Sequence, residues 1–177
     1  MATDAAQQPD PSGARTGVLR AVRAAAARPG RGFAKPAVDA VDLRVSHGAV
    51  GDLHAGTRAL RQVHLVDVAR YDLLRRVGAD VADGYLGENV TTAGVDLLRL
   101  GLDARLQLGA DAVVSLTGQR YPRHEDPATD PVGLGLDEAG VPVGRVGVFA
   151  VVTRPGRVRA GDRLTVLDEG SGALPVL

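Results

Sequence analysis

Short runs in which apolar and polar residues alternate recur along most of the chain. Two such runs, at residues 104–109 and 112–118, are separated only by a few turn-forming residues, which is typical of a β-hairpin. A strongly apolar run within 145–154, a glycine-containing turn and a closing run that ends at Leu167 predict two more strands. The alternation begins near Thr16, where an imperfect pattern favours a first strand over a helix. The chain is therefore predicted to be rich in short strands.

One segment, residues 66–77, has instead the spacing of an amphipathic helix, with apolar residues three or four positions apart. Asp67 can cap the N-terminus of this helix, and Gly78 provides a natural stop. His64 lies just before it in an extended apolar segment, and we expect a structural or surface histidine rather than a ligand. Together the patterns predict a mostly β (α+β) fold, a barrel-like domain with one main helix and short flanking helices.

Length and composition indicate a single domain. A chain of 177 residues is long enough for one domain with a real core and too short for two ordinary ones. Residues 1–14 are polar and without periodicity, so we expect a disordered leader there. Residues 15–168 form the predicted domain, and residues 169–177 are expected to be a tail.

The charge balance excludes some classes of partner. The 21 basic and 21 acidic residues give a net charge of +0, which favours neither nucleic acid nor an anionic membrane, so we expect a small-molecule partner. The N-terminal residues lack the order of a signal peptide, and no apolar run is long enough to span a membrane. We therefore expect a cytoplasmic protein. The absence of cysteine excludes disulfides, thiolate metal ligands and a catalytic thiol.

Charged residues crowd together in the stretch 117–130, where one of the alternating runs ends. Arg120, Arg123 and His124 fall within five residues, and several carboxylates follow them. Arginine presents a planar fork of donors suited to carboxylate or phosphate, and histidine titrates near neutral pH. A solvated loop with surface ion pairs is the alternative interpretation.

Two glycine-rich segments contain further candidate residues. In the first, residues 48–56, Asp52 and His54 are separated by one residue, so an extended backbone would place an acid and an imidazole on one face. A turn-forming aspartate and a surface histidine are the alternative. In the second, residues 84–94, a flexible backbone could present amides to an anion, although such residues also fill ordinary turns. The hydrogen-bonding side chains of this second segment are Glu88, Asn89, Thr91 and Thr92.

In this order, the segments resemble the MOSC domain family. The family includes the C-terminal part of molybdenum cofactor sulfurases, the amidoxime-reducing proteins and small standalone bacterial members such as the hydroxylaminopurine-resistance proteins. The resemblance covers about residues 17–167. It rests on Lys35-Pro36, Gly51-Asp52-Leu53-His54, Arg61-Gln62-Val63, Gly87-Glu88-Asn89-Val90-Thr91-Thr92 with Gly94, Leu106 to Gly109, Thr117-Gly118-Gln119-Arg120-Tyr121-Pro122 and Gly161-Asp162.

The resemblance implies a MOSC-type β-barrel with a pocket for molybdenum cofactor in its pterin-phosphate form, molybdopterin. At the level of the family it also implies molybdenum ion binding and pyridoxal phosphate binding, a bacterial protein, and a chain that could form a homodimer. An anionic phosphate and a polar pterin need convergent cationic and amide donors. By this resemblance the cofactor-binding residues, with His54 beside them, are Lys35, Arg61, Glu88, Asn89, Thr91, Thr92 and Arg120.

Arg123 stands where the family has a cysteine that is the expected metal or sulfur ligand. A guanidinium stays protonated and has no lone pair to give to a metal, and no other cysteine can replace the missing one. The resemblance therefore implies binding of a molybdopterin-like cofactor or a related anionic ligand, with the cysteine-dependent molybdenum or sulfur chemistry lost or altered.

Two other functions remain open. In the first, a molybdenum-independent lyase, isomerase or hydrolase would bind a small anionic metabolite through Arg120 and Arg123. His54 or His124 would then move a proton with help from Asp52 or Glu88, and the catalytic candidates include Arg123 as well. In the second, the domain is a non-catalytic binding module. The four histidines lack the short spacings of a metal motif, so we predict no protein-ligated metal.

Overall fold

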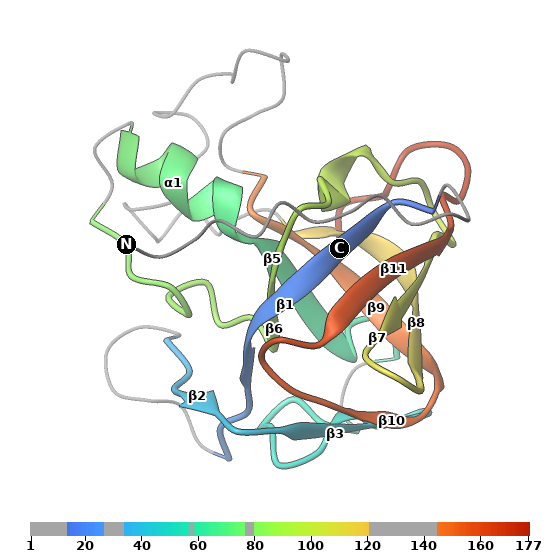
Figure 1. Cartoon of the computed structure of the whole chain (residues 1–177), viewed down its shortest axis with the longest axis horizontal. Helices are drawn as coiled ribbons and strands as arrows, with labels where there is room; N and C mark the ends of the chain where they lie inside the picture. The colour runs from blue at the N-terminus through green and yellow to red at the C-terminus, as the bar shows by residue number, and fades with distance from the viewer. Residues whose placement is uncertain (1–13, 27–33, 57–58, 77–79, 121–144) are drawn as a thin grey trace.

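Seven strands close into a barrel in the computed structural model, which describes residues 14–26, 34–56, 59–76, 80–120 and 145–177 (Figure 1). The barrel strands are β1 (Thr16–Arg23), β5 (Val63–Asp67), β6 (Val90–Ala93), β7 (Arg105–Leu108), β8 (Ala112–Arg120), β9 (Gly147–Arg154) and β11 (Arg163–Asp168). They lie in the order β11-β7-β8-β9-β5-β6-β1, and antiparallel pairing of β1 with β11 closes the circle. Closure leaves no open edge within the barrel wall.

Four short strands lie beside the barrel. β2 (Ala37–Val38) pairs with the end of β1, so the segment that contains Lys35 crosses close to that end. A separate small sheet has the order β10-β3-β4 and is formed by β3 (Val41–Arg44), β4 (Gly48–Ala49) and β10 (Gly156–Val158). The loop with Asp52 and His54 follows β4 directly.

One α-helix, α1 (Val68–Arg76), is present in the described part of the chain, and it connects β5 to β6. These two strands are parallel, and a parallel pair requires such a crossover. Asp67 Oδ1 accepts a hydrogen bond from the Ala69 amide at 2.8 Å, which confirms the predicted N-terminal cap. A 3₁₀ helix, η1 (Leu97–Arg99), follows β6. None of the described helices is long and apolar enough to cross a membrane.

The barrel wall separates two apolar cores. Leu65 and Val148 belong to the core inside the barrel, whereas Val66 belongs to a smaller core outside it, beneath α1. Tyr71 and Leu74 are the two α1 residues buried in this outer core. β5 is therefore covered on both faces, and all five of its residues are buried.

The observed fold confirms the predicted mostly β class with one main helix. The predicted hairpin is formed by β7 and β8, which pair in register from Arg105↔Ser115 to Leu108↔Ala112. The first strand begins at Thr16, as predicted. Residues 1–13 of the predicted leader, the helix stop at Gly78 and residues 121–130 of the charged stretch lie outside the described residues.

Residues 174–177, part of the segment predicted to be a tail, lie against β8. The Gln119 amide donates to the Pro175 carbonyl at 2.8 Å, and the Leu177 amide donates to the Gln119 carbonyl at 3.2 Å. The Leu174 side chain is buried. The segment therefore covers the end of β8 that precedes Arg120.

Candidate functional site

A cluster of buried polar side chains lies on the outer face of the barrel, at one end of β1, β5 and β8. Side chains alternate across a strand, and Leu65 and Val148 point into the barrel, so His64 points outward. Arg120 at the end of β8 pairs with Gly147 at the start of β9, and His64 pairs with Phe149 two residues further along that strand. The sheet register therefore places Arg120 and His64 on the same outer face. We call this group the polar cluster; its members are Arg23, Lys35, Asp52, His54, His64, Glu88, Asn89, Thr91 and Arg120.

Asp52 is the centre of one half of the polar cluster. Its Oδ2 atom lies 2.7 Å from Lys35 Nζ and accepts a hydrogen bond from Asn89 Nδ2 at 3.1 Å. Its Oδ1 atom accepts from the His54 amide at 3.0 Å and lies 3.2 Å from His54 Nδ1. The carboxylate thus holds a lysine, an imidazole and an amide from three separate segments in one arrangement.

The Lys35–Asp52 contact has the short distance of an ammonium–carboxylate pair. Burial alone would raise the pKa of Asp52, but the hydrogen bond and charge of Lys35 hold it below its ordinary value. Burial lowers the pKa of Lys35, and the hydrogen bond and charge of Asp52 oppose this lowering. The lysine side chain is only 4% exposed, so the pair is almost wholly desolvated.

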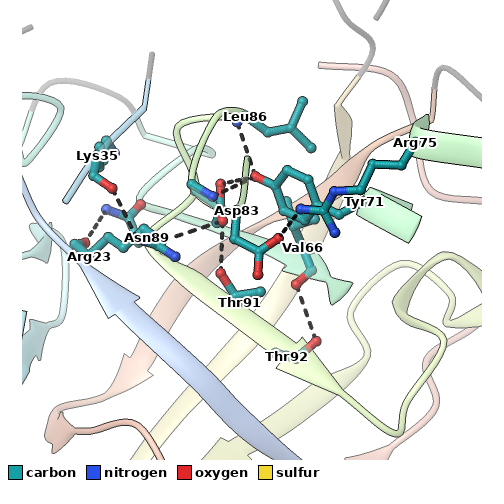
Figure 2. A network of polar contacts seen from close by, with 12 residues as sticks. Arg23, Lys35, Val66, Tyr71, Arg75, Asp83, Leu86, Asn89, Thr91 and Thr92 are labelled. Atoms are coloured by element: carbon teal, nitrogen blue, oxygen red, sulfur yellow. Dashed lines mark hydrogen bonds and ion pairs between the residues drawn. The ribbon is translucent and has the colours of Figure 1, made fainter. Parts of the chain in front are cut away.

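Glu88 is the centre of the other half, and its partners Tyr71, Thr91 and Arg23 are labelled in Figure 2. Tyr71 Oη donates to its Oε2 atom and Thr91 Oγ1 donates to its Oε1 atom, both at 2.8 Å. Arg23 Nε lies 3.6 Å from Oε1, and Arg23 also donates to the Lys35 carbonyl oxygen at 3.1 Å. Glu88 is 0% exposed, so its charge is balanced inside the protein by a buried arginine and two hydroxyl donors.

Gly84 makes the close approach of these groups possible. Its φ is +92°, and a Cβ at this position would lie 2.9 Å from the Lys35 carbonyl oxygen and 3.0 Å from Arg23 Cζ. A side chain at position 84 would clash with the Lys35 carbonyl oxygen and the Arg23 guanidinium, which are hydrogen-bonded to each other. The glycine-rich segment therefore serves to pack the guanidinium, in addition to forming a turn.

Asn89 joins the two halves of the polar cluster. Its Oδ1 accepts from the His64 amide at 3.1 Å, and its Nδ2 donates to the Arg23 carbonyl as well as to Asp52. Thr92 is buried too, but its hydroxyl donates to the Val66 carbonyl at 3.5 Å on a neighbouring strand. Thr92 is therefore held by the barrel wall, and Asn89 fixes the cluster.

His64 is 5% exposed, and its Nε2 atom has no hydrogen-bond partner among the described residues. The pKa of His64 lies well below its ordinary value, because burial and the positive charges of Arg120 and Lys35 disfavour the imidazolium. The centroid of the His64 ring lies 5.1 Å from that of the Phe149 ring. The Arg61 guanidinium also contacts Phe149, with its Cζ atom 5.3 Å from the centroid of the phenyl ring. The imidazole therefore stays neutral in a cationic environment beside a small aromatic surface.

Three cationic side chains, Arg23, Lys35 and Arg120, lie in the polar cluster together with the carboxylates Asp52 and Glu88. Arg23 Nε, like His64 Nε2, is buried without a hydrogen-bond partner among the described residues. Unsatisfied buried nitrogen atoms beside cationic side chains favour an anion that also hydrogen-bonds.

The structure brings together most of the residues that the sequence predicted, and it leaves two of them undescribed. Arg61 lies against the Phe149 ring, which contacts His64, and the Thr92 hydroxyl donates to the Val66 carbonyl. Arg123 and His124 lie outside the described residues. The predicted residues that meet in the polar cluster are Lys35, Asp52, His54, Glu88, Asn89, Thr91 and Arg120.

Three members of the arrangement were not predicted as site residues. Arg23 is the last residue of a strand in an arginine-rich chain, so nothing in the sequence distinguishes it. Tyr71 lies on the apolar face of α1, where a tyrosine fits an ordinary core position. His64 was expected to be structural or on the surface, and it proves to be buried beside Lys35 and Arg120.

Comparisons with known proteins agree with the fold. Residues 50–165, more than half of the chain, match the MOSC domain. The crystal structure of YuaD from Bacillus subtilis is similar, with a TM-score of 0.67 and 21% identity over 86% of this chain and 96% of that chain. YiiM from Geobacillus stearothermophilus gives a TM-score of 0.62 and 19% identity, over 90% of this chain and 79% of that chain.

YiiM from Escherichia coli gives a TM-score of 0.60 and 18% identity, over 89% of this chain and 73% of that chain. No match was found among curated proteins. The family match covers the loop with Asp52 and His54, the segment with Glu88 and Asn89, and the end of β8 with Arg120. The chain belongs to the MOSC domain family.

Proposed function

We propose that this MOSC-type protein binds a molybdopterin-like cofactor or a related phosphorylated anion at the polar cluster. The observation that supports the proposal is the convergence of Arg23, Lys35 and Arg120 on the unsatisfied buried nitrogen atoms Arg23 Nε and His64 Nε2. Both buried carboxylates already accept hydrogen bonds from internal donors. An anion at Arg120 and Lys35 would meet cationic donors.

The residues fit the phosphate and ring portions of such a ligand. Lysine and arginine donors suit a phosphoryl group, with arginine able to make bidentate contacts. Phe149 is partly exposed and is flanked by Arg61 and His64, so it offers a face against which a flat polar ring could pack. Lys35 and Arg120 would hold the anionic end, and Phe149 would orient the ring.

The residues do not fit the metal portion of the cofactor in the family's usual way. The chain has no cysteine, and no group of three histidine, cysteine or carboxylate side chains suited to a metal occurs in the described ranges. Arginine at position 123 cannot supply the soft ligand that a thiolate would provide. The proposal is therefore limited to recognition through phosphate and ring, and no step is assigned to molybdenum.

The test is to purify the protein from a host that makes the cofactor and to assay released pterin fluorescence and molybdenum. We expect pterin to accompany the wild-type protein and to be lost from Arg120→Ala. Arg157→Ala is the matched control, because Arg157 is exposed in β10 and pairs only weakly with Asp42 at 3.7 Å. Wild-type protein that releases neither pterin nor any other phosphorylated ligand would contradict the proposal.

A second candidate is a molybdenum-independent enzyme that moves a proton on a small anionic metabolite. The observation that favours it is the His54 Nδ1 to Asp52 Oδ1 contact of 3.2 Å. A carboxylate that accepts from Nδ1 fixes the tautomer in which Nε2 is the basic nitrogen, as in acid–base dyads. The His54 side chain is 30% exposed, so a substrate held by Arg120 could reach it.

If the protein is such an enzyme, substitution of His54 should affect turnover rather than ligand binding. Once a substrate has been identified, His54→Asn is expected to lower kcat by about 100-fold or more while binding persists. His47→Asn is the control, since His47 lies outside the polar cluster. A ligand-induced rise in melting temperature without turnover of any bound compound would favour a non-catalytic binding module instead.

A further inference from the structure

The starting point is the end of β8, which continues beyond its neighbour β7. The two strands pair as far as Ser115 of β8, and the Leu116 amide still donates to the Ala104 carbonyl at 2.9 Å, just before β7. The opposite edge of β8 stays paired with β9 up to Arg120↔Gly147. Beyond Leu116, the edge that faced β7 therefore needs another partner for its backbone groups.

Residues 174–177, which we call the strap, are that partner. The two backbone hydrogen bonds of Gln119 described above join this edge of β8 to the strap, in a parallel bridge between Gln119 and Val176. Gln119 Nε2 also donates to the Leu174 carbonyl at 2.8 Å. The strap therefore replaces β7 as the neighbour of β8, and Gln119 makes three hydrogen bonds to it.

Gly118 provides the space that the strap occupies. A Cβ at Gly118 would lie 2.5 Å from Leu177 Cγ and 2.7 Å from the Pro175 carbonyl oxygen, so a larger residue would push the strap away from β8. Leu174, at the other end of the strap, is buried, whereas Val176 is 57% exposed. Two leucines therefore anchor the strap, and the valine between them faces solvent.

The strap holds the peptide group that precedes Arg120. The Gln119 carbonyl and the Arg120 amide belong to one planar unit, so the hydrogen bond from the Leu177 amide to this carbonyl also orients the Arg120 backbone. On the opposite edge Arg120 pairs with Gly147, and its carbonyl accepts from the Val146 amide at 3.4 Å. The last residue of β8 is therefore supported from both edges of the strand.

The Arg120 side chain belongs to the polar cluster, on the other side of the barrel wall from the Gln119 side chain. Gln119 pairs with Val148, whose side chain lies in the inner core, so Gln119 faces inward and Arg120 faces outward. Burial is the main cause of the lowered pKa of His64, and the charge of Arg120 is the next. Burial also lowers the pKa of Lys35, and Arg120 adds to this lowering. The β8 backbone thus connects the strap to the cluster.

We propose that Gln119 and Leu177 are positioning residues of the ligand site, which hold the end of β8 so that Arg120 reaches the polar cluster. This role rests on the proposed function for its ligand, and it makes the strap a part of the site. Without the strap, Arg120 would keep its pairing with β9 but lose the support on its other edge. A ligand would then bind a cationic donor whose position is less well fixed, at a cost in affinity.

Two substitutions displace the strap from opposite sides. Leu177→Ser removes the side chain that packs on Gly118, and Gly118→Ala fills the same space from β8 without changing the strap. The φ of Gly118 is not positive, so its backbone tolerates alanine. We expect hydrogen exchange of the Gln119 amide to be about 10-fold faster or more in both variants. Val176→Ser is the matched control on the same strap, and exchange at Gln119 should be unchanged in it.

The His64 ring reports the position of Arg120 without any ligand. In histidine-selective NMR, Arg120→Ala gives the reference change in the His64 resonance, because it removes a charge that acts on the ring. We expect Leu177→Ser and Gly118→Ala to shift the resonance in the same direction by a part of that change, and Val176→Ser to leave it in place. A strap that only stabilises the fold would lower the melting temperature and leave the His64 resonance unchanged.

Calorimetry with sulfate as the probe tests whether the strap acts through Arg120. Leu177→Ser is expected to weaken sulfate binding by a part of the loss of about 10-fold or more expected for Arg120→Ala. In an Arg120→Ala background, Leu177→Ser should cause no further loss, because the side chain that the strap positions is already missing. Leu177→Met has a similar volume and should bind sulfate as the wild type does.

The failures are distinguishable. Unchanged exchange at Gln119 in both strap variants, an unchanged His64 resonance, or an equal loss of sulfate affinity with and without Arg120 would overturn the inference and leave the proposed function intact. Wild-type protein that binds neither sulfate nor a phosphorylated ligand would overturn the proposed function. The His64 resonance would still decide whether the strap positions Arg120.

Discussion

Removal of one buried hydroxyl, Tyr71→Phe, is expected to destabilise the protein strongly. Tyr71 Oη donates to Glu88 at 2.8 Å and accepts from the Gly84 amide at 3.0 Å and the Leu86 amide at 3.1 Å. Burial raises the pKa of Tyr71, so the hydroxyl keeps its proton and can donate at any ordinary pH. The variant leaves one carboxylate oxygen and two amides without their partner in a region that excludes water.

The magnitude follows from these three contacts. A hydrogen bond between neutral groups contributes about 1 kcal/mol, and one to a charged group contributes about 2 kcal/mol. The expected loss for Tyr71→Phe is therefore about 3 to 4 kcal/mol, with little change in packing because the ring remains. In a Glu88→Gln background the charged acceptor is gone, so the same change should cost about 1 kcal/mol less.

Urea unfolding followed by far-UV circular dichroism measures the free energy of unfolding and its denaturant slope. Thr153→Val is the control, because this exposed threonine donates a single bond to the Val113 carbonyl at 3.2 Å and should cost less than about 1 kcal/mol. A loss below about 1 kcal/mol for Tyr71→Phe, with an unchanged slope, would refute the assigned role of the hydroxyl.

Three further predictions concern single side chains. Burial raises the pKa of Asp67 to about 6 from an ordinary 3.8, so the folded state binds this proton more tightly and stability falls as pH rises from about 4 to 6. Asp67→Asn keeps a capping oxygen and should stabilise the protein by about 1 kcal/mol at pH 7.5 but not at pH 3.5. Urea unfolding at the two pH values measures the free energy of unfolding, and an equal effect of the substitution at both would contradict the raised pKa of Asp67. Lys35→Met leaves Asp52 buried without its cation and should lower the free energy of unfolding by about 3 kcal/mol. Asp52→Asn in the same chain should restore part of this stability, and thermal unfolding that detects no restoration would argue against the Lys35–Asp52 pair. Arg120→Ala should weaken sulfate binding about 10-fold or more by calorimetry, whereas equal affinity in wild type and variant would exclude Arg120 from the anion site.

The strands could be predicted from the sequence where one face of the sheet packs against an apolar core and the other face does not. The alternation of β8 and its short turn to β7 gave the hairpin, and Asp67 gave the start of α1. In β5 the alternation is lost, because α1 and the outer core cover the face that would otherwise be polar. His64 therefore lies in an apolar segment whose pattern does not distinguish a site residue from a structural or surface histidine.

The polar cluster was only partly predictable, since its contacts join segments far apart in the chain. The motif residues Asp52 and Glu88 could be identified individually, but their different partners could not. Asp52 binds Lys35, whereas Glu88 is enclosed by Tyr71 and Arg23. Those pairings depend on how β1, β5 and β6 lie side by side in the closed barrel, which periodicity along one strand does not encode.

The most direct test of the anion site is native mass spectrometry of protein purified from a host that makes molybdopterin. We expect a noncovalent adduct with the mass of a phosphorylated ligand, which denaturation releases. The adduct should be present in wild type and Arg157→Ala, and absent from Arg120→Ala. An adduct retained at full occupancy in Arg120→Ala, or wild-type protein without any phosphorylated ligand, would contradict the central claim.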